Sequence, residues 1–243
     1  MESSKHKKCF ISSCFVGSHF HKPDIPSTFP RMKGYDYFLF TNIDKKHFKT
    51  SWSIINIDFN NTCKSITQSR YPKFQGWKQL KNYDIIIYCD AYLRPIENAK
   101  VWDKIVMQTV HSKNGIVQSP HPIRKCPYME CQEIVKAKKD SVENIRKTLQ
   151  LFKEHKLEKD CGLWENVCFC YYTRNVNVQT LFNKLWEIYS SEKYTHRDQP
   201  LYMLAIHLTG IKPEVVHGQG DGRQGYMRKL VKQSGKTGNH MYV

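Results

Sequence analysis

Short runs of hydrophobic residues recur through the first half of the chain, each bounded by turn-forming or charged residues. They are rich in Ile, Val, Phe and Tyr, a composition typical of β-strands. Residues 85–88 are apolar without interruption, as in strands that are covered on both faces of a parallel sheet. Polar, helix-compatible connections separate the runs, among them residues 67–83. We therefore predict an α/β fold with a mostly parallel central sheet flanked by helices, whose first strands cover residues 8–16, 35–41, 53–57, 84–89 and 115–118.

Helical periodicity dominates the second half of the chain. Between residues 130 and 156, apolar side chains recur every three to four positions with lysines and acids opposite, which predicts an amphipathic helix. A strand is predicted at residues 166–173, and a second helix at residues 178–189. A third helix is predicted to begin near Thr195-His-Arg-Asp198, whose spacing resembles a capping box. It should end at Gly210, since glycine favours the left-handed conformation that closes many helices.

The last residues of the chain differ in composition from the rest. Residues 218–243 hold six of the twelve glycines, and five Lys or Arg against one Asp. Such a composition predicts a flexible basic segment. No internal repeat is visible. We therefore predict one domain, residues 1–217, followed by a basic, glycine-rich tail, residues 218–243.

The overall composition is that of a globular protein in a reducing compartment. Of the 243 residues, 40% are hydrophobic, which excludes a disordered chain. No stretch approaches the roughly 18 consecutive apolar residues of a membrane span. The nine cysteines lack the dense spacing of a secreted disulfide scaffold, and the pairs Cys126/Cys131 and Cys168/Cys170 lack the usual spacing of zinc sites, so structural thiols are favoured. These features predict a soluble, cytoplasmic protein, with peripheral membrane attachment left open.

The net charge of +16 indicates a polyanionic partner or substrate. Nucleic acid, an acidic membrane surface and the pyrophosphate of a nucleotide would all suit such a charge. Because the basic residues are spread along the chain, the charge alone does not choose among these partners.

Asp90 is the first candidate for chemistry because it ends the apolar run at residues 84–89. A carboxylate at the carboxyl end of a parallel strand lies where open α/β sheets bind ligands, and it could hold a divalent cation that bridges a diphosphate. It could equally cap a turn. Arg70 and Lys73 lie upstream and three residues apart. They could converge on the same pyrophosphate from a helix or turn, or belong to a solvated basic face.

Three motifs follow Asp90 in order along the chain: His121-Pro-x-Arg-x-Cys-x-Tyr-x-Glu130, Gly162-Leu-Trp-Glu-Asn166 and Arg197-Asp-Gln-Pro200. With Tyr83-Asp84 and Tyr88-Cys-Asp90 before them, they resemble a family of glycosyltransferase-like domains. This family is known from plant Golgi proteins of pollen turgor control and seed mucilage synthesis, and it has relatives in bacteria and large viruses. The resemblance covers roughly residues 8–213.

The resemblance implies a GT-A type fold, with a donor-binding half at about residues 8–95 and an acceptor half at about residues 96–217. It implies that Asp90 belongs to a reduced Asp-x-Asp element, which holds Mn²⁺ or Mg²⁺ against the diphosphate of a UDP-, GDP- or TDP-sugar. Tyr92 stands where the full element has a second carboxylate, so the strength of metal binding is an open question. His217 is implied as a further metal ligand. Donor contacts are expected from Thr41, Arg70, Lys73, Asp90 and Arg223, the last as part of a lid over the diphosphate.

Two carboxylates of the acceptor half suit acid–base chemistry. Asp198 lies at a predicted helix N-terminus, where the helix dipole favours the ionised form that a base needs, although a capping residue would also lie there. Glu165 neighbours Trp164, which could stack on a sugar face or belong to the core. We expect Asp198 to deprotonate the acceptor hydroxyl and Glu165 to bind the acceptor. Further acceptor contacts are expected from His121, Arg124, Trp164 and Arg197.

The sequence as a whole predicts an enzyme, a glycosyltransferase that uses a nucleotide-diphosphate sugar and a hydroxyl acceptor such as a glycan, glycoprotein or lipid. Two alternatives remain open. The net charge and the 14 tyrosines would suit a nucleic-acid-binding protein or a nuclease. No zinc finger, RNP aromatic pair or basic arm beyond the tail is visible, so we do not expect a nucleic-acid partner. Tyr92 would suit a catalytically inactive glycosyltransferase-like binding module.

Overall fold

A seven-stranded sheet forms the centre of the computed structural model, which describes residues 5–17, 24, 26–47, 49–60, 62–217 and 225–235. Its strands are β1 (Lys8–Cys14), β2 (Asp36–Thr41), β3 (Ser53–Asn56), β4 (Ile85–Cys89), β6 (Ile116–Pro120), β7 (Trp164–Tyr172) and β8 (Glu214–Val215). They are ordered β3-β2-β1-β4-β7-β6-β8. Only β7 runs antiparallel to its neighbours β4 and β6, and the other pairs are parallel. The mostly parallel α/β sheet predicted from the sequence is therefore confirmed.

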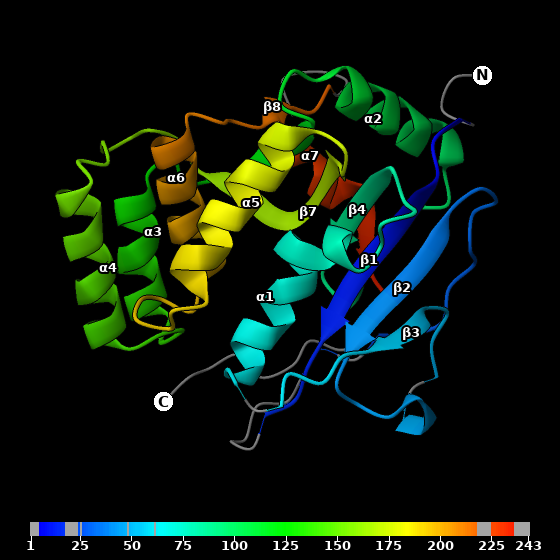
Figure 1. Cartoon of the computed structure of the whole chain (residues 1–243), viewed down its shortest axis with the longest axis horizontal. Coiled ribbons are helices and arrows are strands. Elements are labelled where there is room, and N and C mark those ends of the chain that lie inside the picture. The colour runs from blue at the N-terminus through cyan, green and yellow to red at the C-terminus, as the bar shows by residue number, and fades with distance from the viewer. Residues whose placement is uncertain are drawn as a thin grey trace.

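Helices cover both faces of this sheet. They are α1 (Ser65–Gln75), α2 (Ala99–His111), α3 (Pro127–Lys136), α4 (Val142–Glu154), α5 (Val176–Tyr189), α6 (Asp198–Thr209) and α7 (Tyr226–Lys229), with short 3₁₀ turns at Lys45–His47 and Gly76–Lys78. Helices α1, α5 and α6 pack on one face, whereas α2 and α7 pack on the other. Helices α3 and α4 stand side by side at one end of the molecule (Figure 1). No helix in the described part of the chain has the length and apolarity that crossing a membrane requires.

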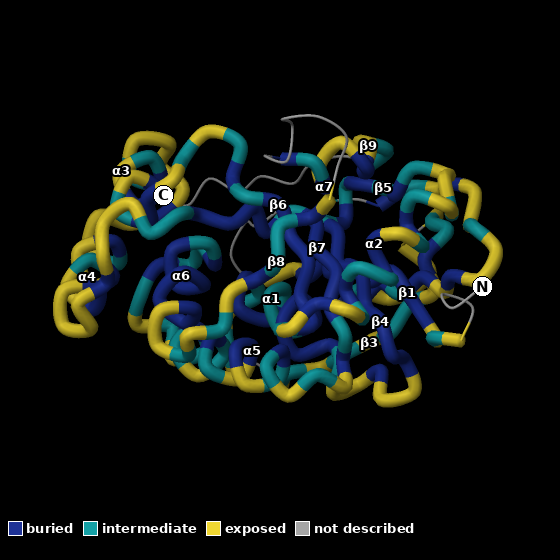
Figure 2. The backbone as a smooth tube through the Cα atoms, turned by 90° about the horizontal axis from the view of Figure 1, so that it is seen from above, coloured by how far each residue is buried: buried dark blue, intermediate teal, exposed yellow. Residues whose placement is uncertain are grey.

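Strand β4 shows why its sequence is apolar at every position. Ile86 and Tyr88 belong to the core beneath α1 and α5, and Ile85, Ile87 and Cys89 belong to the core beneath α2. Successive side chains of a strand point to opposite faces, so every position of a strand that is buried on both faces lies in a hydrophobic core. Figure 2 shows this burial running through the central strands, while the outer turns of α3 and α4 are exposed.

The helix predicted between residues 130 and 156 is two helices, α3 and α4. The chain reverses after α3, where Lys138 adopts a positive φ of 51°. The side chain of Ser141 then begins α4 by accepting a hydrogen bond from the amide of Asn144. The predicted capping box at Thr195 is also absent in this described segment. Arg197 occupies the N-cap position without a side-chain cap, and α6 begins at Asp198. The predicted end at Gly210 is confirmed, with φ of 67°.

Part of the predicted flexible tail is folded onto the domain. Within residues 225–235, helix α7 precedes β9 (Val231–Gln233), which pairs antiparallel with β5 (Leu93–Pro95). The side chain of Met227 is fully buried, and its amide donates to the hydroxyl of Ser119 at 2.8 Å. Buried apolar contacts and backbone pairing thus fix this segment, which a composition rich in glycine and lysine does not reveal. The rest of the tail lies outside the described residues.

Candidate functional site

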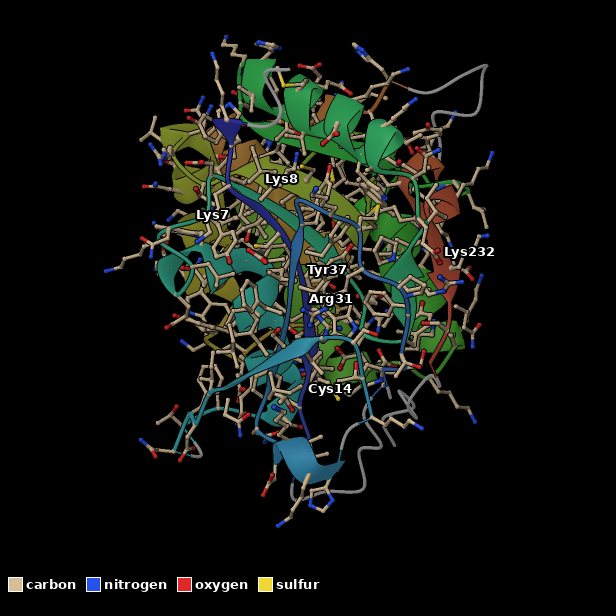
Figure 3. The ribbon with its side chains drawn as sticks, turned by 90° about the vertical axis from the view of Figure 1, so that its right-hand side faces the viewer. Lys7, Lys8, Cys14, Arg31, Tyr37 and Lys232 are labelled. Atoms are coloured by element: carbon tan, nitrogen blue, oxygen red, sulfur yellow. The ribbon has the colours of Figure 1, made fainter. Side chains whose placement is uncertain are left out.

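A pocket lies at the edge of the sheet where the parallel strands end. The chain leaves β1 for β2 and β3 on one side and returns to β4 on the other. Such a reversal of strand order opens a crevice beyond the carboxyl ends of the strands, where α/β proteins bind ligands. Here Cys14 ends β1, Asp90 follows β4, His121 follows β6, and Glu165 stands at the start of the antiparallel β7. All four residues line one pocket of about 300 Å³. Figure 3 marks the two ends of β1 by Lys8 and Cys14, and the pocket lies at the Cys14 end.

Asp90 forms part of the pocket wall and keeps a carboxylate directed at the cavity. Its Oδ1 accepts a hydrogen bond from the hydroxyl of Tyr88 at 3.0 Å. Burial raises the pKa of Asp90, with Lys73 opposing and Asp24 adding to the shift. Tyr92 lines the same wall, and burial together with the charge of Asp90 raises the pKa of its hydroxyl to about 12. The residue at position 92, where the resemblance would lead one to expect a second carboxylate, is therefore a neutral hydrogen-bond donor.

Arg70 and Lys73 converge from α1, as their spacing predicted, but they converge on Asp198. The Nζ of Lys73 lies 2.8 Å from Asp198 Oδ2, and the Nε of Arg70 lies 3.5 Å from Oδ1. Asn166 also donates to Oδ2, at 3.0 Å. Burial alone would raise the pKa of Asp198, but the two cations outweigh it and hold that pKa well below its usual range. Arg70 still lines the pocket, whereas Lys73 and Asp198 lie behind the wall.

Glu165 is a further carboxylate that lines the pocket. Its side chain is 3% exposed, and its Oε1 accepts a hydrogen bond from Arg228 of α7 at 3.1 Å. Its Oε2 has no hydrogen-bond partner among the residues that the structure describes. Burial raises the pKa of Glu165, Arg228 opposes the shift, and the charge of Asp90 adds to it. A buried carboxylate with a raised pKa and a free oxygen is suited to accept a proton.

Cations and a neutral histidine line the other end of the pocket. The Nδ1 of His121 accepts the backbone amides of Ile123 and Arg124, at 3.2 and 2.9 Å. Burial and the charges of Arg124 and Arg228 lower the pKa of His121 to about 4, so the ring is neutral near pH 7. Arg124 forms an ion pair with Glu130 of α3. Lys139 and Arg197 complete this end.

Five predicted site residues in the described part of the chain do not line the pocket: Lys73 and Asp198, which lie behind its wall, and Thr41, Trp164 and His217. Trp164 is buried in the core, where its backbone carbonyl accepts a hydrogen bond from Gln199. Thr41 is fully buried at the end of β2. The side chain of His217 is 78% exposed, and its Nε2 lies 3.8 Å from Glu214. Arg223 lies outside the described residues.

The sequence-based predictions missed several residues that line the pocket. Tyr88 and Glu130 stood within the quoted motifs but received no role. Arg228 belongs to the predicted basic tail, residues 218–243, whose composition marks no single position. Lys139 had no distinguishing signal, because it is one of several lysines near residues 136–139. Its place in the site depends on the turn between α3 and α4, which the periodicity did not predict.

The pocket offers a divalent metal ion a partial ligand set. Among the described residues, no group of three or more His, Cys, Asp and Glu side chains could enclose such an ion. Asp90 can supply one or two oxygens, and Mg²⁺ is commonly held by one or two carboxylates while phosphates and waters complete its shell. A nearby cation would also stabilise the ionised form of Asp90, whose pKa is raised. The residues therefore fit a metal ion that binds together with a diphosphate, and His217 lies away from this position.

The fold and the pocket define an α/β protein with a polar, charged ligand site at the carboxyl edge of its sheet. Its sequence matches no protein-family model and no curated protein. Among solved structures, the fold is similar to that of mouse xyloside xylosyltransferase 1 in its apo form, with a TM-score of 0.46 and 10% sequence identity. The match covers 93% of this chain and 97% of the mouse chain. At this level of likeness, the match does not assign an activity.

Proposed function

We propose that this protein is a glycosyltransferase that transfers a sugar from a nucleotide-diphosphate donor to a hydroxyl acceptor. One observation supports it above all. A carboxylate at the strand switch point, a second carboxylate with a raised pKa, and several cations share a single pocket of about 300 Å³. Sugar transfer needs these groups together, because the diphosphate leaves as a polyanion while the acceptor hydroxyl loses a proton.

In this proposal, the donor diphosphate binds at the Asp90 end of the pocket. Mn²⁺ or Mg²⁺ bound there would be held by Asp90 and the phosphates, and would offset the negative charge that develops on the leaving group. Arg70 lines the same region and keeps its guanidinium oriented through Asp198. Tyr92 and Tyr88 add hydroxyl donors beside Asp90.

We assign the base to Glu165 in place of Asp198. A transfer that inverts the anomeric carbon needs one base to deprotonate the acceptor hydroxyl. Asp198 is bound to Lys73, neighbours Arg70, and has a lowered pKa, so it is a weak proton acceptor that lies behind the pocket wall. Glu165 faces the pocket with a raised pKa and one oxygen without a partner among the described residues. Asp198 instead positions the two cations of α1.

The experiment that tests the proposal is release of nucleoside diphosphate from a panel of UDP-, GDP- and TDP-sugars, with and without Mn²⁺. We expect slow hydrolysis of at least one donor in the presence of Mn²⁺, which Asp90→Asn reduces by at least about tenfold because the donor diphosphate loses its contact with Asp90 through the metal ion. Asp160→Asn is the matched control, since Asp160 is exposed and its φ of 59° also suits asparagine.

Two outcomes would reject this function. Salt-dependent binding of nucleic acid without turnover of any donor would favour the nucleic-acid-binding alternative. Donor binding without any hydrolysis or transfer would favour the inactive binding module, which the tyrosine at position 92 suggests. Full activity of Asp90→Asn would remove Asp90 from its assigned role.

A further inference from the structure

Three cations gather on the rim of the pocket at the end that contains His121. Arg124 precedes α3, Lys139 follows it, and Arg197 stands at the N-cap of α6. Glu130 forms an ion pair with Arg124. Within the described part of the chain, no ion pair is found for Lys139 or Arg197. We define these three cations as the cationic rim.

The cationic rim is held together by a buried carboxylate that does not face the pocket. Asp140 follows Lys139 directly, and its side chain is 1% exposed. Its Oδ2 accepts the hydroxyl of Thr195 at 2.8 Å and the amide of His196 at 2.5 Å. The carboxylate thus connects the turn before α4 to the segment before α6. Lys139 precedes Asp140 and Arg197 follows His196, so these two cations stay close despite their like charges.

The neighbouring Arg197 disfavours the charged form of Lys139. Burial lowers the pKa of Lys139, and the charge of Arg197 lowers it further, while Glu130 opposes the shift. Like charges held together by a fixed scaffold are relieved when an anion binds between them. The N-terminus of α6 has no side-chain cap and adds the positive end of a helix dipole to the same rim.

The cationic rim and Asp90 occupy different ends of the pocket. Asp90 follows β4, whereas Arg124 lies beyond the end of β6, where its backbone amide donates to His121 Nδ1 at 2.9 Å. Glu165 lies between Asp90 and His121, because β7, which carries Glu165, lies between β4 and β6 in the sheet. A group bound at the rim therefore lies on the far side of the proposed base from the donor diphosphate.

We propose that the cationic rim binds an anionic substituent of the acceptor, a phosphate ester or the carboxylate of an acidic sugar. This inference rests on the proposed function and names the class of acceptor. An anion on the rim would orient the acceptor so that its hydroxyl points toward Glu165. Three cations against one carboxylate leave an excess of positive charge that suits such a group.

The experiment uses inorganic phosphate as the probe and calorimetry as the readout. Phosphate should bind the wild-type protein, and Lys139→Ala should weaken its binding by about tenfold through loss of one charge-assisted contact. Arg197→Ala should weaken it similarly. Lys159→Ala is the matched control, because Lys159 is also exposed but lies away from the pocket. Equal phosphate affinity in Lys139→Ala and in the control would overturn the proposal.

Two further experiments identify the kind of anion that binds the rim and test whether the donor binds at a separate site. Glucose 6-phosphate and glucuronate, compared with glucose as acceptors, distinguish a phosphate ester from a carboxylate, and equal use of neutral glucose would overturn the proposal. A titration of the donor in saturating phosphate should give an unchanged donor affinity. Competition between phosphate and donor would place the donor diphosphate on the rim and reject the acceptor assignment. Absence of any donor binding would reject the proposed function, while the phosphate titration would still report on the rim.

Discussion

Replacing Asp198 by asparagine removes one negative charge from a buried cluster and changes little in its shape. The Lys73 side chain is only 4% exposed, and its ammonium lies 2.8 Å from Asp198. Breaking one partner out of a buried pair typically costs about 3–5 kcal/mol, because the remaining charge stays desolvated without compensation. That loss is a large part of the roughly 5–15 kcal/mol that stabilises an ordinary domain.

The assay is urea denaturation of wild type, Asp198→Asn and the exposed control Asp160→Asn at pH 7. We expect a loss of about 3 kcal/mol or more in Asp198→Asn and a change within about 0.5 kcal/mol in the control. Replacing Lys73 by methionine in the Asp198→Asn background should restore at least about 1 kcal/mol, since one of the two uncompensated cations is then gone and only Arg70 remains. A loss below about 1 kcal/mol in Asp198→Asn would refute a structural role for this ion cluster.

The difference in free energy of unfolding between wild type and Asp198→Asn should depend on pH in one direction only. The pKa of Asp198 is lowered in the folded protein, so its stabilising effect is fully present above the unfolded value of about 3.9. It is lost as the pH falls through the lower, folded pKa. The gap in stability between wild type and Asp198→Asn should therefore be constant near neutral pH and close below about pH 4. A gap that widens in acid would contradict the assignment.

Three further predictions concern the pocket and the segment that covers it. Glu165→Gln should lower the transfer rate by about 10²–10⁴-fold, because it removes the base. It should not lower the free energy of unfolding, because it also removes a buried charge. The exposed Glu158→Gln is the control in both assays. Met227→Ala should lower the free energy of unfolding by about 2 kcal/mol or more, since the side chain of this α7 residue is fully buried. The same change at the exposed Met129 should leave the free energy of unfolding unchanged. When the pH falls from 7.5 to 5, the free energy of unfolding of the wild type should decrease by about 2 kcal/mol more than that of His121→Gln. The reason is that the pKa of His121 is about 4 in the folded protein, whereas a histidine of the unfolded chain takes up a proton near pH 6.5. Equal decreases in the two proteins, measured by urea denaturation, would refute this.

The runs of hydrophobic residues, which indicate buried positions, also predicted most strands of the sheet. The uninterrupted apolar run of β4 predicted a strand covered on both faces, and the structure places its side chains alternately in the two cores. Periodicity failed where a local backbone feature decided the outcome. The reversal at Lys138 interrupts a helical pattern that continues on both sides of it. Strand β9 is three residues long, too short for any pattern, and its pairing with β5 fixes it.

The candidate site was predictable wherever it lies at a strand end. Asp90, His121 and Glu165 each stand next to a strand, and strands that end at the same edge of a sheet bring such residues together. The pairing of Arg70 and Lys73 with Asp198 was not predictable, because it joins residues far apart in sequence. Charge and spacing show which cations lie on one face of a helix, but not which carboxylate will neutralise them.

The central claim is that a nucleotide sugar binds at the Asp90 end of the pocket, and calorimetric titration tests it most directly. UDP-, GDP- and TDP-sugars are titrated into wild type, Asp90→Asn and the control Asp160→Asn, each with and without Mn²⁺. The account predicts that one donor binds wild type and control alike, and that Asp90→Asn weakens this binding by at least about tenfold in the presence of Mn²⁺. Binding of no donor, or equal affinity in Asp90→Asn and the control, would contradict it.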